Sequence, residues 1–393
     1  MKRICVVGAS LAGLSTARAL RAQGYDGELV VVGEEARRPY DRPPLSKGFL
    51  TGVDAAELAL EAQDEDLGIT WRLGTRAVSM SAGPVVTLAN GERLACDGVV
   101  VATGSIARRE LPGSDLPGVH VLRTLDDALD LRASLRRGGP VVVVGGGFIG
   151  SEVASTAREF SRDVTLLVGD DAPLRAALGP HADVVAALHR DRGITLVADA
   201  RVTEVVQVGT ALDVRLADGT AHRASTVVLG IGALPAVEWL ADSGVTVGDG
   251  VRCDGGGATT LAGVVAVGDC AAWYDPALGR HHRVEHWTGA REQAPVAAAT
   301  LLSGGTAPVR PLRPPYVWSD LHGRRIQMAG HRELADSMAV EAGSVEECSF
   351  LVVYRRDGDP VAALAVDQPQ QFMSVRRRLV QVPAHPSFEG ALR

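Results

Sequence analysis

Two glycine-rich loops contain residues whose types and spacing are suited to binding a cofactor. The second loop, in VVVVGGGFIGSE (141–152), has the spacing G-x-G-x-x-G, and a similar loop lies in ICVVGASLAGL (4–14). Their spaced small residues are Gly8, Ser10 and Gly13 in the first loop and Gly145, Gly147 and Gly150 in the second. Larger side chains there would keep the backbone away from the pyrophosphate of a dinucleotide, which rests on the N-terminus of the following helix. The small Ser10 is compatible with this role.

Each loop lies inside a predicted strand–helix–strand module that positions it. The first module has a strand at Ile4–Val7, a helix at Leu11–Gln23, a strand at Leu29–Val32, and then Glu34 and Glu35. The second has a strand at Val141–Val144, a helix at Ile149–Phe160, a strand at Val164–Val168, and then Asp170 and Asp171. An acid about 20 residues beyond the loop is typical of dinucleotide-binding modules. An Asn-Gly or Asp-Gly hairpin and a further apolar strand follow each module. A lone glycine loop often serves only packing, but two complete modules in the same order predict two bound dinucleotides.

Composition excludes several other classes of protein. The chain has 393 residues and a formal net charge of −7, which argues against a general nucleic-acid binder. No apolar run is long enough to span a bilayer, and we expect no membrane association. The opening MKRICVVGAS has the charged and apolar parts of a signal peptide, but it runs into a glycine loop. We therefore predict a buried strand there and a cytoplasmic protein. The five cysteines form no C-x-x-C pair, so we expect isolated buried thiols, no metal site and no iron–sulfur cluster.

Several stretches along the whole chain resemble the FAD-dependent ferredoxin reductases of bacterial oxygenase systems. They are RPYDRPPLSK (38–47), VVVATG (99–104), LRTLDDA (122–128), VVAVGDC (264–270), EHWTGA (285–290) and YVWSDLHGRRIQMAG (316–330). The resemblance implies an α/β, glutathione-reductase-like flavoprotein with two Rossmann-like dinucleotide-binding domains and a C-terminal α+β cap domain. The FAD-binding domain would be discontinuous, comprising 1–113 and 238–309. The NAD(P)H-binding domain would span 114–237, and the C-terminal interface domain would span 310–393.

The resemblance also implies a set of residues that bind FAD. These are Gly8, Ser10, Leu11, Ala12, Gly13, Glu34, Arg42, Lys47, Ala77, Ala102, Thr103, Gly104, Arg123, Gly268, Asp269, His286, Trp287 and Trp318. Glu34 would accept hydrogen bonds from the adenine ribose; the alternative is a solvated loop carboxylate. Asp269 would hold the ribityl chain, or else would only cap the helix that apparently starts there. The two tryptophans would lie close to the flavin, with core packing as the alternative.

A second set of residues would bind the nicotinamide coenzyme. It comprises Gly145, Gly147, Phe148, Ile149, Gly150, Glu152, Asp170, Asp171 and Gly232. Glu152, on the first turn of its helix, would receive the carboxamide, or would only stabilise the helix N-terminus. NADH-using relatives place Glu where this chain has Val168. Asp170 or Asp171 would then favour NADH, whereas Arg175 could meet the 2′-phosphate of NADPH.

Lys47 is one of only two lysines in a chain whose other basic residues are arginines. An ammonium group is compact and can approach a single flavin atom, whereas a guanidinium is planar and forked. The resemblance places Lys47 beside the isoalloxazine and near Glu152, as the catalytic pair of the site. A surface lysine on a proline-containing loop is the alternative.

The expected function follows from these cofactors. A flavin can accept a hydride from NAD(P)H and release single electrons. Because no cluster-ligating cysteines are present, the one-electron acceptor must be another protein. The resemblance implies a small acidic iron–sulfur ferredoxin that serves a haem monooxygenase or a Rieske-type oxygenase, and a reductase that is a monomer or weak dimer. Docking would use exposed arginines around the cap (Arg310, Arg313 and 376–378), although a solvated helix face explains the last run equally well. The alternative functions are a flavoprotein NADH oxidase and a redox-sensing protein like apoptosis-inducing factor.

Overall fold

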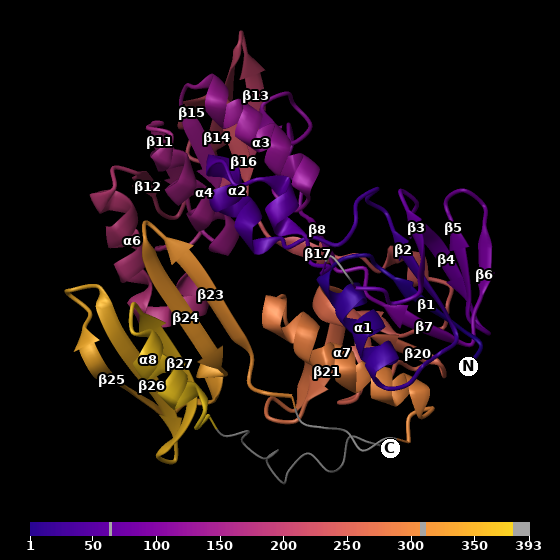
Figure 1. Cartoon of the computed structure of the whole chain (residues 1–393). Coiled ribbons are helices and arrows are strands. Elements are labelled where there is room, and N and C mark those ends of the chain that lie inside the picture. The colour runs from indigo at the N-terminus through magenta and orange to yellow at the C-terminus, as the bar shows by residue number, and fades with distance from the viewer. Residues whose placement is uncertain (63–64, 307–311, 380–393) are drawn as a thin grey trace.

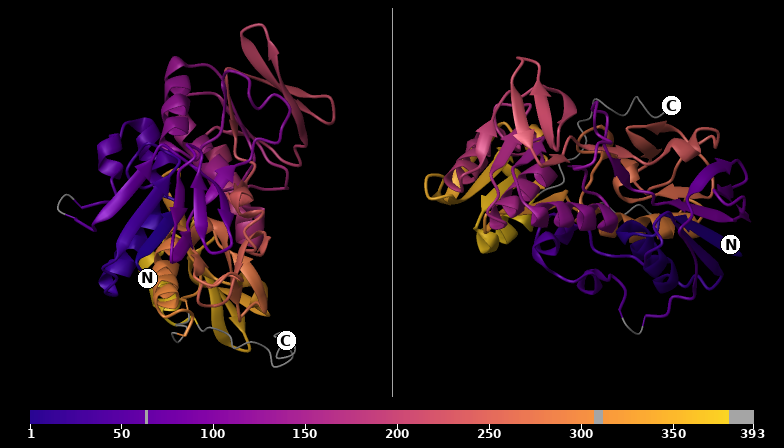
Figure 2. Two further views of the ribbon diagram at one scale, coloured as in Figure 1. Left: turned by 90° about the vertical axis from the view of Figure 1, so that its right-hand side faces the viewer. Right: turned by 90° about the horizontal axis from the view of Figure 1, so that it is seen from above.

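The computed structural model describes residues 1–62, 65–306 and 312–379. Three lobes are visible in Figure 1: one formed by the N-terminal part together with β20, β21 and α7, one formed by the middle of the chain, and one formed by the C-terminal strands. The two views of Figure 2 show the same three groups of elements from the side and from above. The first two lobes each contain a five-stranded parallel sheet, and the third contains a five-stranded antiparallel sheet. The expected fold class, two Rossmann-like modules and a cap, is confirmed.

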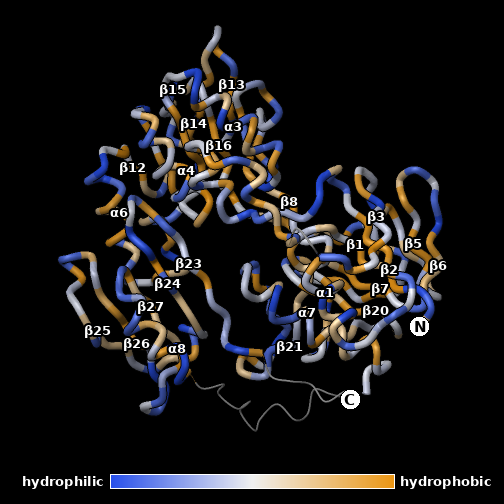
Figure 3. The backbone as a smooth tube through the Cα atoms, in the orientation of Figure 1, coloured by the Kyte–Doolittle hydropathy of each residue, from blue (hydrophilic) through white to orange (hydrophobic). Residues whose placement is uncertain are grey.

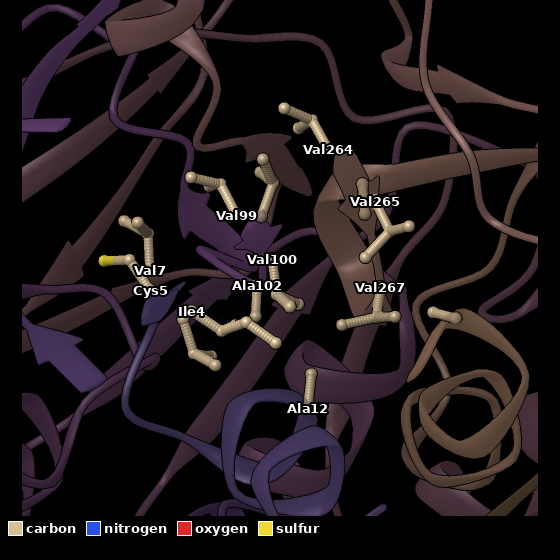
Figure 4. Close-up of a cluster of buried hydrophobic side chains, with 14 of the residues drawn as sticks. Ile4, Cys5, Val7, Ala12, Val99, Val100, Ala102, Val264, Val265 and Val267 are labelled. Carbon is tan, nitrogen blue, oxygen red and sulfur yellow. The ribbon is translucent and has the colours of Figure 1, made fainter. Parts of the chain in front are cut away.

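The parallel sheet of the first lobe joins distant segments of the chain. Its order is β20 (Val264–Ala266), β7 (Gly98–Val101), β1 (Arg3–Val7), β2 (Glu28–Gly33) and β3 (Ile69–Leu73). The helices α1 (Leu11–Ala22) and α7 (Trp287–Leu302) pack against each other beside it. Strands covered on both faces have continuous apolar sequences, which explains the runs of valine. Figure 4 shows side chains of β1, β7 and the β20 region meeting Ala12 of α1 in this core.

The second lobe repeats this arrangement. Its parallel sheet has the order β12 (Thr195–Val197), β11 (Val164–Leu167), β10 (Val141–Val144), β16 (Thr226–Leu229) and β9 (Val119–His120). Its helices are α3 (Leu125–Arg137), α4 (Phe148–Glu159), α5 (Arg175–Leu178) and α6 (Ala182–Asp191). Every strand and helix predicted for the two modules is present, with ends that differ by no more than one residue.

Smaller sheets accompany the two modules. The three-stranded sheets are β4 (Ala77–Ser81), β5 (Val85–Leu88) and β6 (Arg93–Ala95), and β13 (Val202–Val208), β14 (Ala211–Leu216) and β15 (Ala221–Ala224). The others are β8 (Ser105–Ala107) with β17 (Ala233–Pro235), and β18 (Val247–Gly248), β19 (Gly250–Cys253), β21 (Ala271–Asp275) and β22 (Arg280–Arg283). The predicted Asn-Gly and Asp-Gly turns join β5 to β6 and β14 to β15. Gly91 and Gly219 adopt φ of +88° and +87° there, which glycine tolerates best.

One local expectation was wrong. Asp269 does not begin a helix, because it lies in the single 3-10 turn η5 (Gly268–Cys270), which leads directly into strand β21. The other 3-10 turns are η1 (Pro43–Ser46), η2 (Ala55–Leu58), η3 (Gly179–His181), η4 (Glu238–Leu240) and η6 (Arg332–Leu334).

The C-terminal lobe is a sheet covered on both faces. Its order is β23 (Tyr316–Leu321), β24 (Arg324–Gly330), β27 (Asp359–Val366), β26 (Ser349–Arg356) and β25 (Ser337–Ser344). Helix α8 (Pro369–Arg376) buries Phe372 and Val375 against one face. The other face shares a buried apolar cluster with residues of the second lobe such as Leu178 and Val185. Figure 3 shows that apolar sequence coincides with the strands, while the loops are mostly polar.

A segment of the first lobe crosses to the second. Residues 40–58 contain η1, the short helix α2 (Gly48–Thr51) and η2, and Figure 1 shows α2 next to α4. Tyr40, Leu45 and Phe49 are buried in one cluster with side chains of α3, α4 and β10. This packing carries Lys47 out of the first lobe and towards the second.

Candidate functional site

The two glycine loops are built alike. Gly8 has a φ of +126°, and a Cβ added to it would lie 2.0 Å from the Ala102 carbonyl oxygen of the neighbouring strand. Gly145 has a φ of +106°, and its Cβ would lie 2.3 Å from the Gly230 carbonyl oxygen. The close approach of the neighbouring backbone is therefore enough to require glycine at both positions, whether or not a ligand is bound. Gly147, at the middle of its loop, has nothing within 4 Å of an added Cβ, so that position borders open space.

The helices that follow these loops begin without side-chain caps. Neither Ser10 before α1 nor Gly147 before α4 accepts a capping hydrogen bond, and neither helix has an acid in its first turn. By contrast, Thr124 and Asp127 form a complete capping box at the start of α3. The free N–H groups and the helix dipole of α1 and α4 suit an anion such as a pyrophosphate. The two loops therefore fit a pair of dinucleotides.

A cluster of charged groups surrounds the first loop. Arg42 donates to the Glu35 carboxylate at 2.6 Å, to the Ser10 hydroxyl at 3.2 Å and to the Arg123 carbonyl at 2.6 Å. The Glu34 side chain is exposed, whereas Glu35 also accepts a hydrogen bond from the Tyr40 hydroxyl. Glu34 is thus accessible to a ligand, while Glu35 positions the arginine.

The other residues expected at the flavin come together at the carboxyl ends of the parallel strands. Arg123 forms an ion pair of 2.7 Å with Asp269, and it also donates to the Ser105 carbonyl. Ala102 and Gly104 lie at the end of β7, and Gly268 lies just after β20. Thr103 donates its hydroxyl to the Ala236 carbonyl at 2.6 Å. The carboxyl edge of such sheets is where ligands bind in these folds.

Two more of these residues lie at the rim of this region. Ala77 is buried at the start of β4. His286 occupies the N-cap position of α7 without forming a side-chain capping hydrogen bond, and its Nδ1 atom is buried without a hydrogen-bond partner among the described residues. Burial lowers the pKa of His286 to about 4, so the ring is neutral at physiological pH. An unpartnered ring nitrogen is consistent with a polar ligand beside it.

A half-buried Lys47 and a buried Glu152 form an ion pair between the first two lobes. Lys47 Nζ lies 2.8 Å from Glu152 Oε2, and the Glu152 side chain is only 5 % exposed. The other oxygen, Oε1, accepts a hydrogen bond of 2.6 Å from Ser319 of the C-terminal lobe, and the Ser46 hydroxyl donates to Oε2. Glu152 is the fifth residue of α4, so the prediction that it lies on the first turn was wrong. The carboxylate, which belongs to the second lobe, therefore receives hydrogen bonds from the other two lobes.

The two tryptophans expected near the flavin lie next to each other. Trp287 of α7 and Trp318 of β23 meet edge to face with centroids 5.9 Å apart, and Tyr316 stacks on Trp318 at 5.8 Å. Trp287 Nε1 donates to the Asp41 carboxylate at 2.7 Å. Burial raises the pKa of Asp41, and the Trp287 hydrogen bond opposes this rise. The residues that sequence comparison missed are Asp41, Ser46, Tyr316 and Ser319. All four lie inside the quoted stretches 38–47 and 316–330, but only the tertiary structure brings them together.

The surroundings of the second loop bear on the choice of coenzyme. Val168 is buried and follows β11, so no acid stands at that position. Asp170 and Asp171 are exposed just beyond it. Arg175 forms ion pairs with Asp171 at 2.6 Å and with Asp183 at 2.9 Å. The hydrogen bond from Arg175 lowers the pKa of Asp171, which keeps that carboxyl ionised.

The remaining residues of the second set lie around the same loop. Phe148 packs against the apolar cluster shared with the C-terminal lobe, whereas the Ile149 side chain is 40 % exposed. Gly232, with a φ of +106°, lies beyond β16 near Arg108. The Ile149 side chain is therefore accessible to a ligand bound at the start of α4.

Two expectations, one about the arginines and one about the cysteines, need correction. Arg376 is not an exposed arginine, because its side chain is only 18 % exposed and its guanidinium stacks over Tyr316 at 4.1 Å. Arg313 and 377–378 are exposed, and Arg310 lies outside the described residues. The thiols are not all buried either, since Cys96 and Cys348 are only partly buried. Within the described residues no helix has both the length and the apolar character needed to cross a membrane.

Comparison with known proteins places the chain in a family. Residues 2–294 match the family described as pyridine nucleotide-disulphide oxidoreductase, and residues 316–387 match the reductase C-terminal family. The ferredoxin–NAD(+) reductase component of the biphenyl dioxygenase system of Paraburkholderia xenovorans is 36% identical, over 98% of this chain and 95% of that protein. Rhodocoxin reductase of Rhodococcus erythropolis is 33% identical, over 98% of this chain and 91% of that protein.

Solved structures give the same result in three dimensions. A ferredoxin reductase from Rhodopseudomonas palustris superposes with a TM-score of 0.90 at 30% identity, covering 99% of this chain and 98% of that one. Putidaredoxin reductase, in its covalent complex with putidaredoxin, superposes with a TM-score of 0.89 at 31% identity, covering 100% of this chain and 96% of that one. The chain therefore belongs to the pyridine nucleotide-disulphide oxidoreductases, in the branch that contains the ferredoxin–NAD(+) reductases of oxygenase systems.

Proposed function

We propose that this protein is an NADH-dependent ferredoxin reductase that uses FAD. It would pass electrons from NADH to a small acidic iron–sulfur ferredoxin that serves a haem monooxygenase or a Rieske-type oxygenase. The observation that supports this proposal is the Lys47–Glu152 ion pair, which lies where the three lobes meet. The loop PPLSKGFL (43–50) contains no cysteine, so it lacks the redox-active thiols that a disulphide reductase would need there.

In this proposal, the chain holds its two cofactors with different elements. The loop around Gly8 and the start of α1 would hold the FAD pyrophosphate, and the ion-paired Arg123 and Asp269 would face its ribityl chain. The loop around Gly147 and the start of α4 would hold the coenzyme pyrophosphate. Bound FAD would supply the chemistry that accepts a hydride and releases single electrons.

Lys47 and Glu152 would orient the reacting rings. The Lys47 ammonium is fixed by Glu152 and by the Pro43 carbonyl at 3.3 Å, so it offers a positive charge at one defined position. The Glu152 carboxylate is held by serine hydroxyls from two other lobes. Groups fixed in this way can hold a hydride donor and acceptor at contact distance without reorganising.

The charges beyond β11 favour NADH over NADPH. Arg175 already donates to Asp171, Asp183 and the Gly179 carbonyl. A 2′-phosphate placed on this arginine would therefore also lie close to two carboxylates, and like charges repel. A ribose hydroxyl can instead donate to Asp170 or Asp171, both of which are exposed there.

A ferredoxin assay tests the proposal. NADH-dependent reduction of cytochrome c is measured with and without an added iron–sulfur ferredoxin, and rapid reduction is expected only with the ferredoxin. Rapid NADH consumption by O₂ alone would indicate an oxidase and would refute the proposal, as would slow turnover with every ferredoxin tested. Charge reversal at the exposed Arg377 or Arg378 should raise the KM for ferredoxin but not for NADH. The matched control is Arg93→Glu, on the exposed surface of strand β6 in the first lobe.

A further inference from the structure

Three side chains that take no part in the proposed electron transfer meet where the first and C-terminal lobes touch. Asp275 lies at the end of β21, His282 lies on β22, and His331 follows β24 of the C-terminal sheet. One potential ligand atom of each lies within 4.8 Å of those of the other two. The first two residues are 7 positions apart and the third is 49 positions farther along, so the sequence alone gives no metal-binding motif.

The hairpin geometry explains how the first two side chains share a face. Asp275 pairs with Arg280 across the β21–β22 ladder, and Trp273 pairs with His282. Residues two apart on a strand point to the same side, so His282 is the diagonal neighbour of Asp275 on one face. His281 points to the opposite face, where it is exposed and meets Tyr274 edge to face.

His331 reaches this face from the C-terminal lobe. Its backbone N–H donates to the Val361 carbonyl of β27, which fixes its position, and its side chain is only 9 % exposed. Its Nε2 atom lies 3.0 Å from Asp275 Oδ2, and its other nitrogen, Nδ1, lies 3.9 Å from Glu333. The His282 Nδ1 atom is buried and has no hydrogen-bond partner among the described residues. This ring nitrogen of the cluster is therefore without a hydrogen-bond partner among the described residues.

The donor set and its spacing match a particular class of ligand. Two imidazoles and one carboxylate are typical ligands of Zn²⁺ and similar divalent transition metals, whereas Mg²⁺ and Ca²⁺ prefer oxygen alone. Tetrahedral ligation with bonds of about 2.0–2.1 Å separates donor atoms by about 3.4 Å. The 3.0 Å between Asp275 and His331 is already close to this value, and a small movement of the His282 ring would complete the set.

A cavity of about 280 Å³ lies directly beside the three side chains. Its lining includes all three of them, together with Trp273, Gln293 and Pro315. It offers room for a water molecule as the fourth ligand, which is the arrangement of a three-residue zinc site with one open position.

We propose that Asp275, His282 and His331 form a binding site for one Zn²⁺ or similar divalent transition-metal ion that fastens the C-terminal lobe to the first lobe. The site is separate from the Lys47–Glu152 pair, so a test of metal binding there does not depend on the ferredoxin reductase activity.

Calorimetric titration of the full-length, FAD-containing protein with ZnCl₂ tests this proposal. The protein must carry no histidine tag and must first be freed of metal with a chelator. We expect one Zn²⁺ per chain, with affinity at least about tenfold weaker in His282→Ala, His331→Ala and Asp275→Asn, because each removes one of three ligands. Co²⁺ should give the visible absorption of a tetrahedral site in the wild type only. Zn²⁺ should also raise the Tm of the wild type, since it would bind the folded form.

The matched control is His281→Ala, which removes the neighbouring histidine on the other face of the same strand and should leave Zn²⁺ binding unchanged. If His331→Ala does not fold, as judged by circular dichroism, His282→Gln and Asp275→Asn make the same test. Failure of the wild type to bind Zn²⁺ would overturn the proposal, and so would equal binding by the wild type and His282→Ala. Displacement of Zn²⁺ by equimolar Mg²⁺ would show an oxygen site and would also overturn it.

Discussion

Replacing Lys47 by Arg keeps the positive charge but changes its shape, so this variant separates a catalytic lysine from a merely charged one. Lys47 Nζ lies 2.8 Å from Glu152 Oε2, and the Lys47 side chain is 21 % exposed. Glu152 cannot yield easily, because Ser46 and Ser319 hold its two oxygens and the side chain is 5 % exposed. The bulkier guanidinium must therefore move towards the open side, where the reacting rings are expected.

The size of the effect follows from covalent geometry. The arginine side chain extends one bond beyond the position of the lysine Nζ, which places its terminal nitrogens about 1 Å farther from the backbone. A misplacement of about 1 Å in a site that aligns donor and acceptor slows the reaction about 100-fold. That factor corresponds to about 2.7 kcal/mol in the activation barrier. We expect little change in folding stability, because the buried carboxylate keeps a cationic partner.

Stopped-flow absorbance measures the effect directly. Oxidised flavin is mixed with saturating NADH under anaerobic conditions, and the limiting rate of flavin reduction is recorded together with FAD content and Tm. The chain provides a matched control in Lys2→Arg, which changes its only other lysine, an exposed residue ahead of β1. Reduction of Lys47→Arg at the wild-type rate, with FAD bound normally, would refute the catalytic role of Lys47.

Three further outcomes are expected. Gly8→Val should lose FAD, since its Cβ would collide with the Ala102 carbonyl and displace the loop; full FAD absorbance in the purified variant would contradict this. Asp171→Ala should raise the KM for NADH in steady-state assays, and a wild-type preference for NADPH would reverse our choice of coenzyme. Lowering the pH should destabilise the fold, because burial lowers the pKa of His189 to about 3, while the unfolded chain binds that proton below about pH 6.5. Stability should thus fall by about 1.4 kcal/mol between about pH 7.5 and about pH 5.5, and denaturant titrations of the wild type and His189→Gln should show a weaker pH dependence in the variant.

The two modules could be predicted from the sequence because their signals are local. Buried parallel strands require continuous apolar runs such as Val141–Val144, and the close backbone approach at Gly8 and Gly145 requires glycine. The sequence signal of each module, an apolar run followed by spaced glycines, lies within a few consecutive residues, although the strands that Gly8 and Gly145 approach are distant in sequence. The prediction of a helix after Asp269 was wrong because the determining contacts there are not local. Pairing of β21 with β19 and β22 imposes a strand.

The candidate site was only partly predictable. Resemblance supplied Lys47 and Glu152, and the structure brings them together because η1 and α2 pack on the second lobe. The serine hydroxyls that hold Glu152 come from positions 106 residues before it and 167 residues after it. No periodicity or spacing rule encodes contacts of that range. The same holds for the Asp275, His282 and His331 cluster, which exists only once two lobes have docked.

The order of strands in the first sheet has a consequence for synthesis on the ribosome. Strand β7 ends at Val101, but its neighbour β20 begins only at Val264. At translation rates of about 5–20 residues per second, the nascent chain carries an unpaired, valine-rich edge for roughly ten to thirty seconds. Such an edge is a template for pairing with other chains. The second lobe emerges during this interval and can fold as an insert, while the first must wait. Yield of the intact protein should therefore depend on how well the cell protects that edge during translation.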